Sequence, residues 1–345
     1  MRERDISLDL MRFIGILVII IAHTDPPGWL YQLRNFGTPL LIVTSALTHS
    51  IIYKRKVFDV RTFLIKRLTR LVFPAWLFLT FFYPVLWITA NLMKVEYPFT
   101  FKEILLSYPL YSGFVWIFKV YFILALITPF TLNYKRKITN KLLYFTIILL
   151  VYFVYEVIYF YSKSYIPPGL RDFLDTVVFV IIPYSAIYIY GFKLEDLSRR
   201  TIIYIILGST AIFVFLAIKY YMINGGFVQP QEYKYPPRIY YLSFTFIAIH
   251  IIYLLRDPLK NFFSKSAIVW LSSKSLWIYL WHILAYYLLN FTLGWGSRSL
   301  LVSLGCALFL LGFSVLITYL QTYYVDRFLI ENKSVFLKRI SKYLK

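Results

Sequence analysis

Long apolar runs alternate along the chain with short polar segments that are rich in Lys, Arg, Pro and Gly. Runs of about 18 or more apolar residues are typical of helices that cross a membrane, because about 20 residues at 1.5 Å each span the hydrocarbon core. The pattern predicts an all-α integral membrane protein with about ten transmembrane helices. We place these helices at residues 7–24, 36–53, 71–93, 113–132, 142–162, 173–192, 201–220, 239–256, 267–290 and 299–325.

The composition agrees with this class of protein. Of the 345 residues, 60% are hydrophobic and 21% are aromatic, with 32 Tyr and 32 Phe. Such a share of apolar surface excludes an ordinary soluble domain, and the aromatic residues suit the two interfaces of a bilayer. The net charge of +21 does not indicate nucleic acid as a partner, because the basic residues gather at the ends of the apolar runs.

The distribution of Lys and Arg predicts the orientation of the chain in the membrane. With the N-terminus inside, the polar segments on the cytoplasmic side hold 25 basic residues and those on the exterior side hold nine. Positive charge favours the cytoplasmic side of a membrane. We therefore expect ten spans with both the N- and C-termini in the cytoplasm, in the plasma or inner membrane of the cell.

The chain reads as one membrane domain followed by a basic tail. Residues 1–325 contain all the predicted spans, and residues 326–345 form a basic, weakly amphipathic segment. Such a tail is expected to lie on the inner membrane surface, where anionic lipids attract it. The longest exterior loop, residues 219–238, is rich in Tyr, Pro and Gly, and it is a candidate lid and a candidate platform for sugar rings.

Two ionisable residues stand in the first predicted span. Arg12 and His23 are eleven positions apart, with nothing ionisable between them. On a helix, eleven residues make about three turns, so both side chains share one face and lie roughly 16 Å apart along it. An ionisable side chain inside a membrane is costly, and it indicates a functional site by default.

Each of these two residues also has a structural interpretation. His23 is either a proton acceptor or a hydrogen-bonded side chain at the outer interface. Arg12 either binds a ligand, reaches to the inner interface, or pairs with Asp9 one turn earlier. Asp25 is a candidate to orient the His23 ring, although it is not on the same helical face.

A pair of arginines lies at the cytoplasmic mouth of the third span. Arg67 and Arg70 are three residues apart and so share a helix face, and two guanidinium groups on one face suit a phosphate or pyrophosphate group. The alternative is that they are ordinary positive charges of the inner side. In the second span, Ser45 and His49 are neighbours on one face, and Ser45 with Ala46 favours close packing between helices.

The ninth span contains a further histidine. His282 lies deep within the apolar run, so burial demands a hydrogen-bond partner. It either orients a catalytic group or satisfies a contact between helices.

Taken together, these residues resemble the membrane acyltransferase 3 family, which includes O-antigen and peptidoglycan O-acetyltransferases. The resemblance covers essentially the whole chain, with two departures: Ala46 replaces a glycine, and Lys119 and Tyr121 stand where many members carry a glutamate. The matching elements are R-x10-H at Arg12 and His23, a small-residue motif at Thr44-Ser45-Ala46-Leu47, R-x-x-R at Arg67, Arg70 and Pro74, a tryptophan motif at Trp116 and Pro129, and a late motif at Ser275, Tyr279, Leu280 and His282.

The resemblance implies transfer of an acyl group, acetyl in the first place, from cytoplasmic acyl-CoA to a hydroxyl group of an envelope carbohydrate or glycolipid. His23 and Arg12 would be the catalytic residues. Arg67, Arg70 and Arg12 would hold the phosphates and arm of the donor, while Ser45, Trp116, Tyr279, His282 and Asp25 would support the site. We expect acyl-CoA as a substrate, and we expect no permanently bound cofactor and no metal.

Two rival classes of function remain open from the sequence. Intramembrane Arg and His also mark transport paths, so a transporter or flippase of a lipid-linked or glycan substrate is the alternative. The chain shows no paired repeat with broken helices, which a transporter would favour. The other class is a non-catalytic subunit of an envelope complex.

Overall fold

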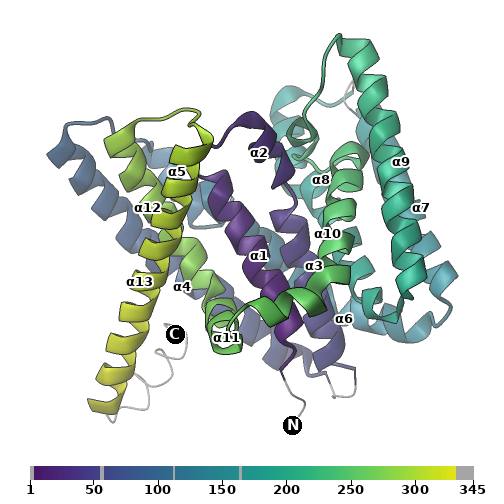
Figure 1. The fold of residues 1–345 in the computed structure, drawn as a ribbon, viewed down its shortest axis with the longest axis horizontal. Helices are drawn as coiled ribbons and strands as arrows, with labels where there is room; N and C mark the ends of the chain where they lie inside the picture. Colours follow the sequence, from purple (N-terminus) through teal and green to yellow (C-terminus); the bar gives the residue numbers. More distant parts are fainter. Residues whose placement is uncertain (1–3, 55–57, 112, 163–164, 332–345) are drawn as a thin grey trace. The chain divides into compact units, whose positions relative to one another are not determined.

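The computed structural model describes residues 4–54, 58–111, 113–162 and 165–331, and within these ranges the chain is helical and contains no β-strand (Figure 1). The all-α class predicted from the apolar runs is therefore confirmed. The helices are α1 (Ile6–Ala22), α2 (Gly28–Leu33), α3 (Gly37–Ile52), α4 (Val60–Met93), α5 (Phe101–Ser107), α6 (Trp116–Lys137), α7 (Lys141–Ser162), α8 (Pro168–Gly191), α9 (Arg199–Asn224), α10 (Ile239–Leu259), α11 (Lys265–Ser273), α12 (Ser275–Leu293) and α13 (Leu300–Glu331).

Eight of the described helices are long and apolar enough to cross a membrane, so the protein is a multi-pass membrane protein. They coincide with the last eight of the ten predicted spans. The first two predicted spans correspond to α1 and α3, which have 17 and 16 residues. Helices of this length lie at or just below the lower limit for crossing the hydrocarbon core. The count of ten and the cytoplasmic position of both termini stay predictions.

The prediction of one continuous span at residues 267–290 is wrong for its first residues. The helix is interrupted at Lys274. The short helix α11 ends before this residue, and α12, which begins after it, forms the apolar span. The Ser273 hydroxyl donates a hydrogen bond to the Trp270 carbonyl at 2.7 Å. The Lys274 amide donates to the same carbonyl at 3.0 Å, and apolar periodicity does not reveal the break.

Helix α4 begins eleven residues before its predicted start. Asp59 caps it, because its carboxylate accepts a hydrogen bond from the Arg61 amide. The 34 residues of α4 make about 51 Å of helix, which exceeds the roughly 30 Å of a hydrocarbon core. Its basic first turns therefore extend beyond the apolar region.

The chain divides into two compact units. The first contains Met1–Gly15, Asn35–Phe58 and Ile123–Ser264, and the second contains Ile16–Arg34, Asp59–Phe122 and Lys265–Lys345. Helices α1 and α6 each contribute to both.

In the first unit, α3 packs against α8, and α9 packs against α10. The contact between α3 and α8 depends on small residues, since a Cβ atom added to Gly191 would lie 2.7 Å from the Ala46 side chain. The close approach expected of Ala46 is thus present. Small residues allow helix backbones to approach in a membrane, where dispersion contacts hold helices together.

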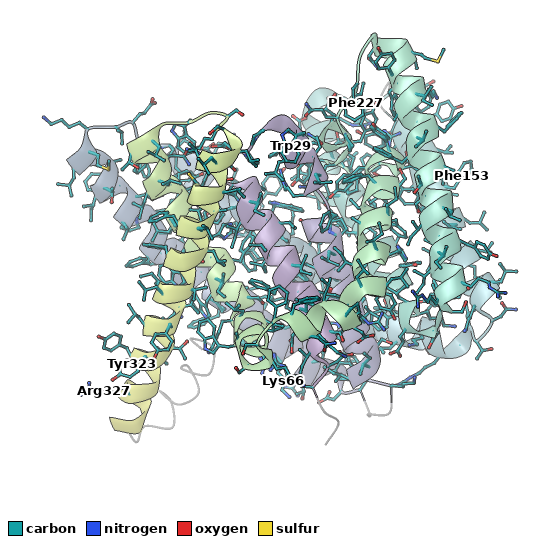
Figure 2. All side chains as sticks on the ribbon, viewed as in Figure 1. Trp29, Lys66, Phe153, Phe227, Tyr323 and Arg327 are labelled. Carbon is teal, nitrogen blue, oxygen red and sulfur yellow. The ribbon has the colours of Figure 1, made fainter. Side chains whose placement is uncertain are left out.

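In the second unit, α12 packs against both α4 and α13 (Figure 1). The Trp281 indole of α12 donates a hydrogen bond to the Gln321 side chain of α13 at 2.8 Å. In each unit large apolar side chains are exposed on the helices, among them Phe153 of α7 in the first unit and Tyr323 of α13 in the second (Figure 2). In a bilayer these side chains contact lipid rather than water.

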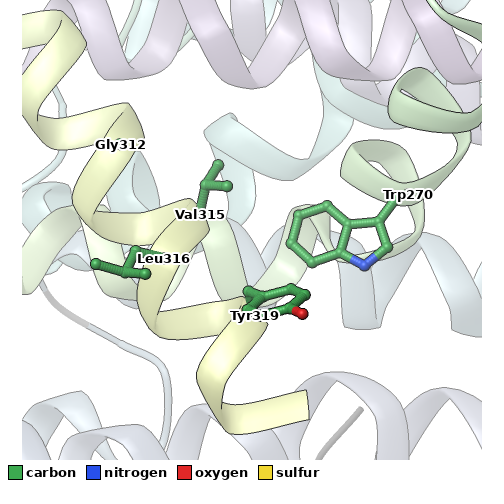
Figure 3. Close-up of a pocket in the computed structure, with 5 residues that line it drawn as sticks. All are labelled: Trp270, Gly312, Val315, Leu316 and Tyr319. Atoms are coloured by element: carbon green, nitrogen blue, oxygen red, sulfur yellow. The ribbon is translucent and has the colours of Figure 1, made fainter. Parts of the chain in front are cut away.

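An open groove of about 460 Å³ lies beside α13 (Figure 3). Its lining is apolar and aromatic, and it includes none of the residues that the sequence singles out for chemistry. Such a surface suits the hydrocarbon chain of a membrane lipid. The lining residues are Trp270, Gly312, Val315, Leu316 and Tyr319.

Candidate active site

His23 lies directly after the last residue of α1. Its amide donates to the Ile20 carbonyl at 3.0 Å, the i to i−3 bond of a tightened last turn. The His23 ring lies against the same helix end, with Nδ1 3.0 Å from the Ile19 carbonyl oxygen. Helix ends leave carbonyl groups without amide partners, and a side chain that donates to one of them caps the helix.

This contact favours one tautomer of the His23 ring. A carbonyl oxygen only accepts, so the contact with Ile19 favours a proton on Nδ1 and a lone pair on Nε2, with His282 Nε2 as an acceptor. The carbonyl end of α1 also carries partial negative charge.

His282 of α12 is the second partner of the His23 ring. Its Nε2 lies 3.2 Å from His23 Nδ1, and the two ring centroids are 5.0 Å apart. His282 is completely buried, and its ring also contacts Tyr279 at 5.0 Å. The Tyr279 hydroxyl donates to the Phe114 carbonyl at 2.7 Å. The late sequence motif thus reaches the histidine of the first span through a chain of direct contacts.

Asp25 binds an arginine rather than the His23 ring. Its carboxylate lies 3.0 Å from Nη1 of Arg298, in the loop that follows α12. The role expected of Asp25 in orienting the imidazole stays a prediction, and Ile19 and His282 contact Nδ1 of the ring. Burial raises the pKa of the Asp25 carboxyl, and the charge of Arg298 opposes that rise.

Arg298 ties the segment after α1 to the loop after α12. Its backbone amide donates to the Asp25 carbonyl at 2.8 Å, and Nη1 donates to the Thr24 carbonyl at 3.0 Å. Nη2 donates to the Asn290 side chain at 2.7 Å and to the Gly294 carbonyl at 2.9 Å. The side chain is only 8% exposed. These bonds fix the two residues that follow His23.

Three residues of this site were missed in the sequence. Tyr286 contacts the His23 ring at 5.4 Å between centroids, and Asn290 and Arg298 form the bonds described above. The signal for two of them was available, because His282, Tyr286 and Asn290 are spaced at four residues and so lie on one face of α12. Arg298 is the one basic residue between the last two predicted spans.

Arg12 belongs to the first unit and pairs with Asp9. The two side chains are 3.3 Å apart, and Arg12 also donates to the Thr48 hydroxyl at 3.2 Å. Arg4 binds the same carboxylate at 2.6 Å and 3.0 Å. Of the interpretations open for Arg12, pairing with Asp9 is therefore present, while a quarter of the side chain stays exposed.

Arg67 and Arg70 belong to the second unit and project from the first turns of α4. Arg67 is half-buried, with its guanidinium 5.2 Å from the centre of the Phe63 ring, and Arg70 is exposed. Both are accessible to a polyanion.

The remaining predicted residues have supporting positions. Ser45 is half-buried on α3, and one turn later His49 Nδ1 lies 2.5 Å from the Tyr188 hydroxyl in the core of the first unit. Trp116 is half-buried at the start of α6, two residues after the Phe114 carbonyl that accepts from Tyr279. The second unit therefore brings His23, His282 and Tyr279 into contact, and it also contains Asp25, Trp116, Arg67 and Arg70.

Comparison with protein families decides the class of this site. A family model described as an acyltransferase domain matches residues 5–321, which is nearly the whole chain. The chain belongs to the acyltransferase 3 family. It is a membrane acyltransferase, and the transporter alternative is not favoured. Searches among curated proteins and among solved structures gave no match.

Proposed function

We propose that this acyltransferase moves an acyl group, acetyl in the first place, from cytoplasmic acyl-CoA to a hydroxyl group of an envelope carbohydrate or glycolipid. It would then be an EC 2.3.1-type O-acyltransferase of the O-antigen and peptidoglycan kind, in the plasma or inner membrane. The observation that carries the proposal is the state of His23. The contact of its Nδ1 with the Ile19 carbonyl favours the tautomer in which Nε2 has the lone pair of a base.

The proposed reaction uses His23 as a general base. Nε2 accepts the proton of the acceptor hydroxyl while the hydroxyl oxygen attacks the thioester carbonyl. The carbon–sulfur bond then breaks, and the departing CoA thiolate takes the proton from the imidazolium. The alternative is that Nε2 attacks the thioester itself and forms an acyl-histidine. Release of one equivalent of CoA in the absence of acceptor would identify the second route.

The positions of Arg12 and His23 along the first span support an acyl donor that enters from the cytoplasm. Arg12 lies near the predicted inner end and His23 at the outer end, with roughly 16 Å of helix between them, which is comparable with an extended pantetheine arm. The proposal assigns the phosphates of CoA to Arg67 and Arg70. Only the uncharged pantetheine arm of CoA would enter the apolar region, because burying the charged phosphates there costs free energy.

The experiment that tests the proposal confines the donor to one side of the membrane. Proteoliposomes of sorted orientation are supplied with radiolabelled acetyl-CoA on the cytoplasmic face alone or on the exterior face alone, and labelled acceptor is measured. We expect transfer with the cytoplasmic donor alone. Equal transfer from the two faces would contradict the proposed roles of the three arginines. Movement of acceptor without covalent change would contradict acyl transfer.

A second prediction concerns the arginine pair. Replacing Arg67 and Arg70 together with glutamine is expected to weaken CoA binding about tenfold or more, because each charged hydrogen bond contributes about 1.5–3 kcal/mol. The measurement is the dissociation constant of CoA by calorimetry in detergent.

The matched control for the arginine pair is Arg61→Gln with Lys66→Gln. These two residues are exposed on the same helix, and their replacement removes the same amount of charge. If both double variants weaken CoA binding equally, or neither does, Arg67 and Arg70 are ordinary inner-side charges.

A further inference from the structure

The loop between α12 and α13 carries an exposed tryptophan close to the candidate base. Trp295 is 55% exposed, although its ring has two aromatic neighbours. Its flanking glycines, Gly294 and Gly296, have φ angles of 76° and 132°, which side chains other than hydrogen rarely allow. Arg298 holds this loop through its bond to the Gly294 carbonyl. The indole is therefore presented on a fixed loop.

A continuous series of ring contacts joins Trp295 to His23. The indole packs nearly perpendicular to Tyr286, with centroids 5.5 Å apart, and Tyr286 contacts the His23 ring at 5.4 Å. Tyr287 supports the indole from a second contact at 5.6 Å. All four residues belong to the second unit, so this arrangement is internal to it.

We propose that Trp295 is the platform on which a pyranose ring of the acceptor stacks, beside the base His23. This inference rests on the proposed function and adds a binding site to it. The C–H face of a sugar ring is apolar, and an indole is a large, flat apolar surface that has little conformational entropy to lose. The hydroxyl groups at the edge of the ring stay accessible, and one aromatic ring, that of Tyr286, lies between the indole and His23.

The Tyr-rich exterior loop is a weaker candidate for this role. Its Tyr220 and Tyr233 stack on each other at 4.8 Å, and Tyr233 also packs against Tyr240. The start of α10, which follows this loop, is fixed by Glu156. Its carboxylate accepts from the Arg238 guanidinium at 2.6 Å and from the Ile239 amide at 2.7 Å. This loop belongs to the first unit, whereas His23 belongs to the second.

The test measures saccharide binding without donor. The full-length protein in nanodiscs is mixed with tetrasaccharides of glucose, N-acetylglucosamine, mannose or rhamnose, and binding is followed by saturation-transfer NMR. We expect at least one tetrasaccharide to bind, and we expect Trp295→Leu to weaken that binding about tenfold. Trp295→Phe, which keeps an aromatic face of smaller area, is expected to weaken it roughly threefold.

The control separates a sugar platform from a residue of the membrane interface. Trp87 of α4 is 57% exposed, so Trp87→Leu removes a tryptophan of equal exposure. We expect it to leave saccharide binding unchanged. The proposal is overturned if no tetrasaccharide binds the unmodified protein, if Trp295→Leu binds normally, or if Trp87→Leu binds as weakly as Trp295→Leu.

Transfer assays distinguish failure of this proposal from failure of the proposed function. If the unmodified protein binds a tetrasaccharide through Trp295 but moves no acetyl group onto it from acetyl-CoA, the platform stands and the proposed reaction fails. If acetyl transfer occurs and its acceptor KM is the same in Trp295→Leu, the reaction stands and the platform fails. In the supported case, Trp295→Leu raises the acceptor KM and leaves the acetyl-CoA KM unchanged.

Discussion

Replacing His23 with alanine is expected to lower acyl transfer by about 10²–10⁴-fold, the usual contribution of a positioned general base. The variant should still insert and fold, because the ring is only partly buried. The bond that it loses, to the Ile19 carbonyl, is at the end of a helix and not within it. The measurement is turnover of the purified protein in nanodiscs with acetyl-CoA and an acceptor. His23→Gln, which keeps hydrogen-bonding groups but has no base, should be about as inactive.

The control for His23 is a second histidine whose ring also contacts the carbonyl four residues earlier, but which has no proposed role in acyl transfer. His250 of α10 also lies within hydrogen-bond distance of the carbonyl four residues earlier, that of Phe246, at 2.6 Å. It is completely buried beside Tyr190, so His250→Gln is expected to lower stability and to leave turnover per folded molecule near that of the unmodified protein. Near-normal turnover of His23→Ala would exclude both routes proposed for His23, as general base and as acyl carrier.

Removing Arg298 is expected to lower kcat by about 10- to 100-fold without changing the KM for acetyl-CoA. The reason is positional: Arg298→Gln breaks the bonds to Asp25, Thr24 and Gly294 that fix the segment directly after His23. A displacement of about 1 Å in a reacting group costs up to about 100-fold in rate. Asp25→Asn should have a smaller effect in the same direction, because the backbone bonds of Arg298 remain.

A matched ion pair provides the control for Arg298. Arg171 and Asp175 of α8 are also 3.0 Å apart, and their side chains are 12% and 29% exposed, compared with 8% and 29% for Arg298 and Asp25. Arg171→Gln is expected to lower thermal stability by a similar amount and to leave kcat unchanged. Equal losses of kcat in the two variants would mean that Arg298 has only a structural role.

The double variant of Asp25 and Arg298 gives an independent measurement. If the two residues act as one unit, Asp25→Asn combined with Arg298→Gln loses no more activity than Arg298→Gln alone. Fully additive losses would show that each residue acts separately and would contradict the proposed clamp.

The fold class followed from the sequence because membrane helices are determined locally. A bilayer requires every backbone group of a span to bond within its own helix, so apolar length alone indicates a span. Eight predicted spans coincide with helices long enough to cross. The break at Lys274 was not predicted, since the apolar run continues through it and hydropathy does not record backbone geometry.

The sequence by itself also determined which residues to consider at the site. Arg12 and His23 belong to one predicted span, so their spacing is a local property of the chain, as is the spacing of Arg67 and Arg70. The family assignment over residues 5–321 agrees with the ordered motifs that suggested it.

Only the tertiary structure decided which partners these residues have. His282 is 259 positions from His23 in the sequence, and Arg298 is 273 positions from Asp25. No periodicity encodes such pairs, because they depend on how α12 and its following loop pack at the end of α1. The contact of His282 with His23, the bonds of Arg298 and the position of Trp295 all arise from that packing, which is why the sequence suggested His23 and His282 separately but not their contact, nor Tyr286 and Arg298 beside them.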